Sequence, residues 1–277
     1  MKKTDQTVLL LEKNIFSSHK SRLLESLRKK VIGTKKPLII FTPNPEQLVL
    51  AAKDRQFRSD FDQADYLLPD GIGLVLASRV LSLFGKAEPI SQRISGIELS
   101  TDFLEWATDE QWPVLLLGGR DYHQAKNQPV KLAMSAHRRR GDASAAKKLQ
   151  LQWLEGYANV AKPTKREEQL VRQTLRQLKP KIVLVAFGAP WQERWVIEHR
   201  ALLRQTGVKV AMVVGGSFDV LLGRLQRAPL WMRALGLEWF YRLIQEPHRW
   251  RRQLALLEFM KLVFQEVFRK NAIPKKI

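Results

Sequence analysis

Short apolar runs that each end near a glycine or proline recur along the chain and predict buried strands. The runs cover residues 37–42, 64–68, 114–117, 181–187 and 208–214. Most are followed by a segment with helical periodicity, the pattern of strands that alternate with covering helices. Strands without polar alternation are typical of a parallel sheet that is covered on both faces. We therefore predict an α/β, Rossmann-like fold with a largely parallel sheet and flanking helices.

The turns that close these strands are the places where chemistry is expected. In open parallel sheets, ligands bind outside the carboxyl ends of the strands. Thr42 and Asn44 follow the first run, Asp70 follows the second, and Gly215 follows the last. Asn44 also begins the pattern Asn-Pro-Glu-Gln, which is typical of a helix N-cap with a capping box. A capping role for Asn44 therefore stands beside a binding role.

The last 54 residues differ in composition from the rest of the chain. Residues 224–277 contain twelve Lys and Arg against four Glu, and they are rich in Trp and Phe. Apolar residues between 256 and 268 recur at helical spacing beside basic ones. A basic amphipathic helix suits an anionic bilayer, but it equally suits packing on the sheet with a solvated basic face. We predict a catalytic domain at 1–223 and a basic helical C-terminal appendage at 224–277.

The charge of the whole chain indicates an anionic partner. Lys and Arg number 47 against 27 Asp and Glu, which gives a net charge of +20. Nucleic acid, an acidic membrane surface or a phosphorylated substrate would each satisfy such an excess. Residues 120–153 are also basic and polar, and we interpret them as a helix with an exposed loop. The apolar run at residues 8–11 is too short for a leader peptide, so we expect it to belong to the mature chain.

Several common chemistries have no sequence signal. The chain has no cysteine, which excludes thiol catalysis and cysteine–zinc sites. It contains no P-loop, no GxGxxG after the first strand, no HExxH and no GxSxG. One Asp-x-Asp pattern, Asp60-Phe61-Asp62, precedes the second strand instead of ending it, and we interpret it as surface acids. We predict no metal site and no cofactor.

Five segments, in order, carry a resemblance to a known family. They are TPNPE at 42–46, PDGIG at 69–73, RISGIEL at 93–99, FGAPWQE at 187–193, and a long segment from 215 to 247 that contains GGSFD, RAP, GLEW, YRL and EP. Together they resemble the WecG/TagA/CpsF family of bacterial glycosyltransferases, also called glycosyltransferase family 26. The resemblance covers residues 37–250.

This resemblance implies a reaction and its partners. Members transfer an N-acetylmannosamine-type sugar, with inversion and without a metal, from a UDP donor to N-acetylglucosamine on an undecaprenyl diphosphate lipid. The products enter cell-envelope polysaccharides and teichoic acids. The family resemblance further implies a peripheral enzyme on the inner, cytoplasmic face of the bacterial membrane, whose appendage completes the active site. Some members self-associate, so a homo-oligomer is also expected.

The resemblance also implies roles for individual residues. Asp70 matches the family's base, and its alternative role is to cap the helix that follows; Arg93 matches an active-site arginine. An inverting transfer needs a base for the acceptor hydroxyl and positive charge for the leaving diphosphate. The implied donor and acceptor contacts are Thr42, Asn44, Gln192, Gly215, Gly216, Asp219, Arg227, Arg233 and Arg242. The three appendage arginines equally suit a solvated or lipid-facing position.

Two other functions stay open at this point. The excess of basic residues, including the cluster 138–140, is compatible with a nucleic-acid-binding protein, although no nucleic-acid motif is present. A non-catalytic nucleotide-binding homologue is the second alternative. The chain departs from the family at Glu98, where many members carry Asp, which puts the donor sugar in doubt more than the class of reaction. A lipid diphosphate on an anionic membrane explains the charge equally well, so we expect no nucleic-acid partner.

Overall fold

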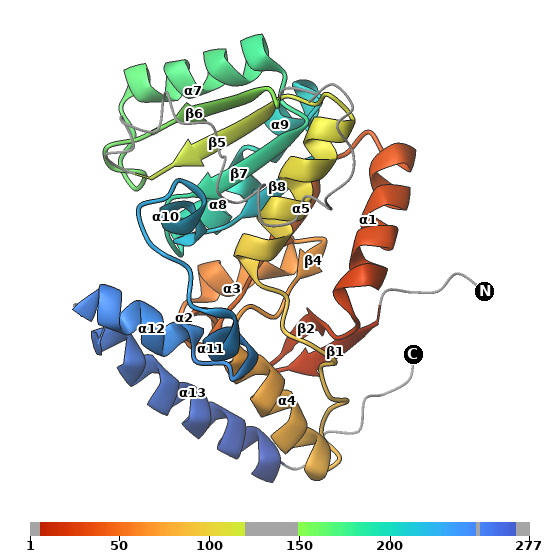
Figure 1. Ribbon diagram of the computed structural model, residues 1–277, viewed down its shortest axis with the longest axis vertical. Helices are drawn as coiled ribbons and strands as arrows, with labels where there is room; N and C mark the ends of the chain where they lie inside the picture. The colour runs from red at the N-terminus through yellow and green to blue at the C-terminus, as the bar shows by residue number, and fades with distance from the viewer. Residues whose placement is uncertain (1–5, 120–148, 248–249, 270–277) are drawn as a thin grey trace.

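The computed structural model describes residues 6–119, 149–247 and 250–269 (Figure 1). Within these residues, six strands form one parallel sheet in the order β4-β3-β8-β7-β5-β6. Their bounds are β3 Leu38–Phe41, β4 Tyr66–Leu67, β5 Val114–Gly118, β6 Leu151–Leu154, β7 Ile182–Ala186 and β8 Val210–Val213. All five strands expected from the sequence are present, and the predicted α/β, Rossmann-like fold is confirmed.

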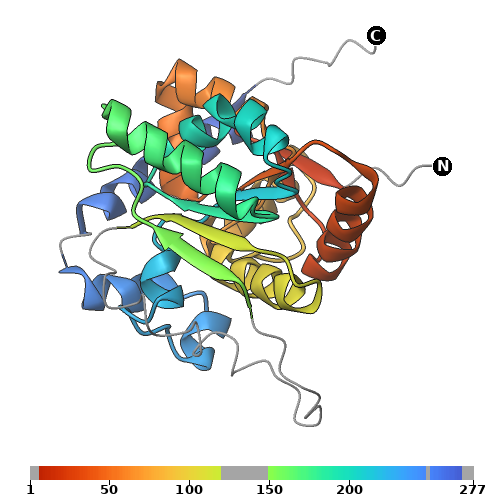
Figure 2. The same ribbon diagram turned by 90° about the horizontal axis from the view of Figure 1, so that it is seen from above.

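Helices cover both faces of the sheet, as Figure 2 shows from above. One face carries α1 Lys20–Gly33, α5 Gly96–Asp109 and α10 Ser217–Leu221. The other face carries α2 Pro45–Lys53, α3 Arg55–Asp62, α7 Lys165–Leu178, α8 Trp191–Glu198 and α9 Arg200–Gln205. The strand side chains are buried toward both layers, which explains why the strands have continuous apolar runs.

Three strands in the described part of the chain were not expected from the sequence. Strand β6 begins inside the segment 120–153 that was interpreted as a helix with a loop, so that interpretation is wrong for residues 151–153. The cluster 138–140 and the rest of 120–148 lie outside the described residues. The N-terminal apolar run forms β1 Thr7–Leu10, which pairs antiparallel with β2 Lys13–Phe16. The two-residue turn between them places Leu11 and Glu12 at positive φ, a conformation that usually selects Asn or Gly.

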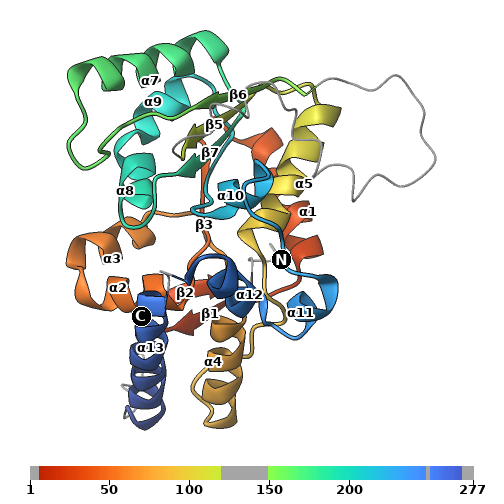
Figure 3. The same ribbon diagram turned by 60° about the vertical axis from the view of Figure 1, so that its left-hand side comes forward.

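The C-terminal segment extends beyond the carboxyl edge of the sheet (Figure 3). It contains α11 Leu230–Ala234, α12 Glu238–Gln245 and α13 Trp250–Phe268. Helix α13 runs beside α4 Ile72–Leu83 and packs on α2 and α4. Its buried side chains are Phe259, Val263 and Val267, whereas Leu256 and Leu262 are partly buried and most of its other apolar side chains, such as Leu257 and Phe264, are exposed. The helix is therefore only half covered by the rest of the chain.

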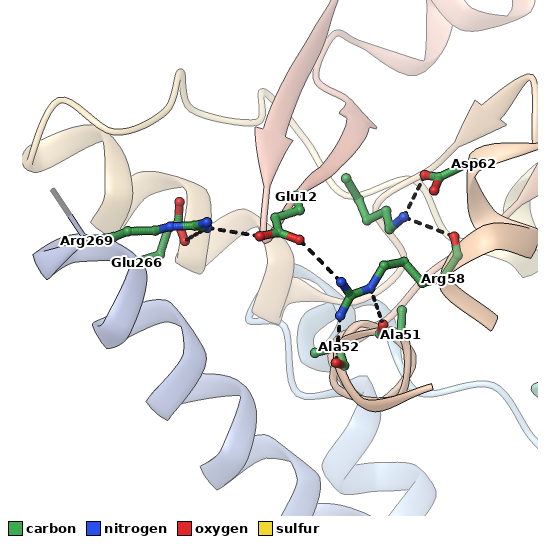
Figure 4. Close-up of polar contacts among 8 residues, drawn as sticks. Glu12, Ala51, Ala52, Arg58, Asp62, Glu266 and Arg269 are labelled. Carbon is green, nitrogen blue, oxygen red and sulfur yellow. Dashed lines mark hydrogen bonds and ion pairs between the residues drawn. The ribbon is translucent and has the colours of Figure 1, made fainter. Parts of the chain in front are cut away.

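The hairpin tip holds the far end of α13 (Figure 4). The carboxylate of Glu12 accepts a hydrogen bond from Arg269 at 3.1 Å and pairs with Arg58 at 3.6 Å. Arg58 also donates to the carbonyls of Ala51 and Ala52 at the end of α2. The left-handed turn thus carries a carboxylate that links α13 to α2 and α3.

None of the helices that the structure describes is long and apolar enough to cross a membrane.

Candidate active site

A cavity of about 540 Å³ opens between the carboxyl edge of the sheet and the appendage. The turns after β3 and β4 form its inner wall, and α12 and α13 form the opposite wall. Because β3 lies between β4 and β8 in the sheet, the turns after all three strands meet at this edge. Segments that are far apart in sequence, from Asn44 to Phe264, therefore share one cavity.

Asp70 lies in this cavity, directly after β4. Its backbone N–H donates to the carbonyl of Pro43 at 3.0 Å, which ties its turn to the turn after β3. Burial raises the pKa of Asp70 to about 6, and Glu238 and Glu98 also raise it, while Arg93 and Arg242 lower it. The N-cap position of α4 is occupied by Gly71, and no side chain caps that helix. The capping alternative for Asp70 is therefore wrong.

Arg93 lies beside Asp70 in the same cavity. The loop that carries it is fixed to the Asp70 turn by a hydrogen bond from the Ile94 N–H to the Pro69 carbonyl at 2.9 Å. Its guanidinium pairs with Glu238 of α12 at 2.9 Å, and both side chains are mostly buried. The core and the appendage thus meet through an ion pair at the candidate site.

Three arginines of the appendage reach the same region. Arg227 pairs with Glu98 at 2.6 Å and with Glu238 at 3.3 Å, and Arg233 lies 3.7 Å from Glu98. Arg242 pairs with Asp219 at 3.0 Å and with Glu246 at 2.9 Å, and it donates to the Gly216 carbonyl. Arg227 and Arg242 line the cavity, whereas Arg233 does not, and its Nε is buried without a hydrogen-bond partner. These side chains are not simply solvated.

Three polar side chains converge on the first residue of α5. A Cβ atom at Gly96 would lie 3.3 Å from Ser217 Oγ, 3.5 Å from Thr42 Oγ1 and 3.8 Å from Asp70 Oδ2. Thr42 donates to the carbonyl of Val213 at 3.2 Å, across the junction of β3 and β8. The amino end of a helix carries free N–H groups and partial positive charge, which suits an anion. Gly96 and Ser217 were not singled out from the sequence.

A buried carboxylate, Glu193, links Gln192 to Gln47, and Gln47 in turn bonds to Asn44. Asn44 accepts from the Gln47 N–H, and Gln47 Oε1 accepts from the Asn44 N–H, so the expected capping box is present. The side-chain amides of Gln47 and Gln192 both donate to Glu193 Oε1 at 2.9 Å. Glu193 is fully buried, and burial raises its pKa to about 7. This carboxylate orients Gln192, whose Oε1 accepts from the Gly188 N–H.

The glycines after β8 also approach the site. Gly215 has a φ of +47°, and a Cβ atom there would lie 3.7 Å from the amide of Gln192. Gly216 is the N-cap residue of α10, and a side chain at that position would collide with the guanidinium of Arg242. Asp219 is engaged with Arg242 and is not part of the cavity wall. The glycine pair therefore lets two polar side chains come close to the backbone.

Acidic groups outside the cavity form no metal cluster in the described parts of the chain. No group of three or more His, Cys, Asp or Glu there is arranged to hold a metal ion. Asp60 is buried and bonds to Gln56 and Arg194, so its interpretation as a surface acid is wrong. Asp62 is largely exposed and pairs with Lys13.

The sequence matches one family over almost its full length. The sequence model of the glycosyl transferase WecG/TagA/CpsF family matches residues 8–273. The chain belongs to this family. Curated relatives include the N-acetylglucosaminyldiphosphoundecaprenol N-acetyl-beta-D-mannosaminyltransferase of Bacillus subtilis strain 168, which is 31% identical over 94% of this chain and 92% of that protein. The protein of the same name from Staphylococcus aureus strain MW2 is 32% identical over 80% of this chain and 78% of that protein. The family membership predicted from the motifs is confirmed.

Proposed function

We propose that this member of the WecG/TagA/CpsF family transfers N-acetylmannosamine from UDP-N-acetylmannosamine to N-acetylglucosamine on an undecaprenyl diphosphate lipid. The observation that carries the proposal is a carboxylate, Asp70, surrounded by arginines in a cavity that the sheet edge and the appendage build together. Relatives that span more than 90% of this chain are named for this activity. The arrangement also argues against an inert homologue, because the charged side chains of the core and the appendage meet at one point.

Asp70 acts as the base in this proposal. Its carboxylate takes the proton of the acceptor hydroxyl while that oxygen forms a bond to the anomeric carbon, and the bond from that carbon to the UDP oxygen breaks. With a pKa of about 6, Asp70 is mostly ionised at neutral pH, yet it is more basic than an exposed aspartate. Attack from the face opposite the leaving group inverts the configuration.

The arginines stabilise the leaving diphosphate. Guanidinium groups match phosphate oxygens with several N–H donors, and such donors lower the barrier when charge develops on the leaving group. Arg93, Arg227 and Arg242 line the cavity and are each held by carboxylates. Each guanidinium has five donors, so N–H groups remain for phosphate beside the ion pairs. We infer that Thr42, Asn44, Gln192 and the Gly215-Gly216 backbone contact the sugar nucleotide.

The appendage brings the enzyme to the membrane in this proposal. Exposed apolar side chains gather on α4, α11, α12 and α13, and examples at the helix tips are Leu83, 85% exposed, and Phe268, 78% exposed. The chain carries a net charge of +20, which favours an anionic surface. We infer a peripheral enzyme on the inner face of the bacterial membrane, where UDP-sugars and the lipid acceptor meet. Self-association and the domain boundary at residue 223 stay predictions.

A transfer assay tests the proposal. Purified full-length protein is mixed with UDP-N-acetylmannosamine and a short-chain lipid diphosphate N-acetylglucosamine, with and without EDTA, and UDP release and product mass are measured. We expect a product heavier by one N-acetylhexosamine, at the same rate in EDTA. UDP binding without any product over a range of acceptors would favour a non-catalytic homologue. If UDP does not bind, the proposal fails and nucleic-acid binding becomes the next hypothesis.

A further inference from the structure

The candidate active-site cavity continues into an apolar groove that the proposed chemistry does not use. Its inner end is lined by Asp70, Arg93, Arg227, Glu238 and Arg242. Its outer end is lined by side chains of two helices: Leu76, Ala77 and Val80 of α4, and Leu256, Met260 and Phe264 of α13. The cavity therefore changes from charged to apolar along its length.

The two helices that form the groove run side by side and in the same direction. Figure 3 shows the two helices side by side. Both begin near the charged end, and their far ends are joined by a hydrogen bond from Lys86 Nζ to the Arg269 carbonyl at 2.7 Å. The groove residues of α4 recur at positions 73, 76, 77 and 80, which lie on one face of a helix. From 73 to 80 this face is about 10 Å long.

Apolar side chains in the groove and beyond it are exposed to an unusual degree. Leu76 is 50% exposed, and Met260 and Phe264 are also about half exposed or more. Past the groove, Leu83 and Phe268 stand almost free at the helix tips. Contiguous exposed apolar surface of this kind marks a binding site on a folded protein. A hydrocarbon chain attached to a group at the charged end would run along the groove and emerge between these tips.

We propose that the groove between α4 and α13 binds the first isoprene units of the acceptor's polyprenyl chain. The inference rests on the proposed function, because it takes the acceptor to be a polyprenyl diphosphate. The charged end then faces the diphosphate and its sugar, the apolar walls face the hydrocarbon, and the exposed tips lead the rest of the chain toward the bilayer. The groove selects the acceptor by its lipid as well as by its sugar.

The test compares two water-soluble acceptors in the absence of detergent and vesicles. Both carry N-acetylglucosamine on a diphosphate; one bears a ten-carbon prenyl chain, and the other bears a methyl group. We expect kcat/KM of the wild-type protein to be at least about tenfold higher for the prenyl acceptor, mainly through a lower KM, because burying the chain is favourable. Leaving out membranes removes any effect of bilayer binding on the ratio.

Polar substitutions in the groove provide the decisive arm. We expect Leu76→Gln and Met260→Gln to bring the ratio between the two acceptors close to one. Leu170→Gln on α7 is the matched control, since Leu170 is 48% exposed and lies far from the cavity, and it keeps the wild-type ratio. A wild-type ratio near one, or an unchanged ratio in the folded groove variants, would overturn the inference. Transfer to neither acceptor would instead contradict the proposed function.

A cross-linking experiment needs no variant. A prenyl acceptor whose chain ends in a diazirine is irradiated with the wild-type protein, and the labelled peptides are identified by mass spectrometry. We expect labels on α4 and α13 that decrease when an excess of unlabelled prenyl acceptor is added. Labels confined to other elements would overturn the inference even if every groove variant failed to fold.

Discussion

Asp70 combines a buried position with a nearby arginine, and this pairing sets its pH dependence. Burial raises its pKa to about 6, and Arg93 limits the rise. We therefore expect kcat/KM to be level above pH 7 and to fall about tenfold per pH unit well below pH 6. A pH–rate profile measured with the water-soluble acceptor checks this. An acid limb near pH 4, typical of an exposed carboxyl, would contradict the assigned environment.

The same shift has a consequence for stability. A carboxyl whose pKa is higher in the folded than in the unfolded protein stabilises the fold below about pH 4, and this contribution is lost as the pH rises through 6. We expect Asp70→Asn, which cannot ionise, to be more stable than the wild type by about 1–3 kcal/mol above pH 7. Urea unfolding at pH 4, 6 and 8 measures this. A variant that is less stable at pH 8 would contradict it.

Glu193 holds two buried amides and is the strongest case of a residue that the sequence did not reveal. Glu193→Ala leaves the side-chain amides of Gln47 and Gln192 without their acceptor, at a cost of about 1–3 kcal/mol each. We expect this loss in urea unfolding together with a higher KM for the UDP-sugar. Glu193→Gln keeps an acceptor oxygen and serves as the matched control. Equal stability of the alanine variant and the wild type would show that the network is not formed.

The contacts that the sequence did not show share one physical reason. Arg227 and Glu98 are 129 positions apart, and Gln47 and Glu193 are 146 apart. Ion pairs and buried amides of this kind depend on which strand ends meet, and periodicity does not carry that information. Asp70 and Thr42 were identifiable because strand-end turns are where ligands bind. Arg93, in the loop between α4 and α5, was identified only through the family resemblance. Glu98 and Glu238 lay in motifs recognised in the sequence, but the sequence did not show that arginines pair with them.

At the scale of elements, the sequence predicted the strands that are continuous apolar runs, and it missed those that lack such a run. Strand β6 contains a glutamine and is only partly buried, so its signal is weak. The β1–β2 hairpin has no turn signal in the sequence, because its two left-handed positions are occupied by Leu11 and Glu12 and not by Asn and Gly. Its turn is supported by the ion pairs of Glu12 with Arg58 and Arg269. Both misses come from tertiary contacts that outweigh local preference.

Helix α13 depends on one buried face for its position. Phe259 is 4% exposed and packs in the main core cluster. We expect Phe259→Ala to destabilise the protein by about 3–5 kcal/mol, because it leaves a cavity between α13 and the core. Phe268→Ala, at a position that is 78% exposed, is the control and is expected to change stability by no more than about 0.5 kcal/mol. Equal losses for the two variants in chemical denaturation would contradict the described packing.

At the scale of the whole molecule, charge and apolar tips act together on a membrane. We expect binding to phosphatidylglycerol vesicles that weakens with salt, and much weaker binding to neutral vesicles. Leu83→Asp with Phe268→Asp adds charge at the exposed tips without touching the core, and should reduce binding at least about tenfold. Ile32→Asp, on the exposed side of α1, is the control. Full vesicle binding by the double variant would show that the membrane contact lies elsewhere.

The central claim is that the cavity shared by the sheet edge and the appendage is the transfer site, with Asp70 as its base. The most direct measurement is the turnover of Asp70→Asn at pH 8, with UDP-N-acetylmannosamine and the water-soluble prenyl acceptor. We expect a folded protein that still binds UDP but turns over at least about 10²-fold more slowly, the usual scale of general-base catalysis. Near wild-type turnover in that folded variant would contradict the account.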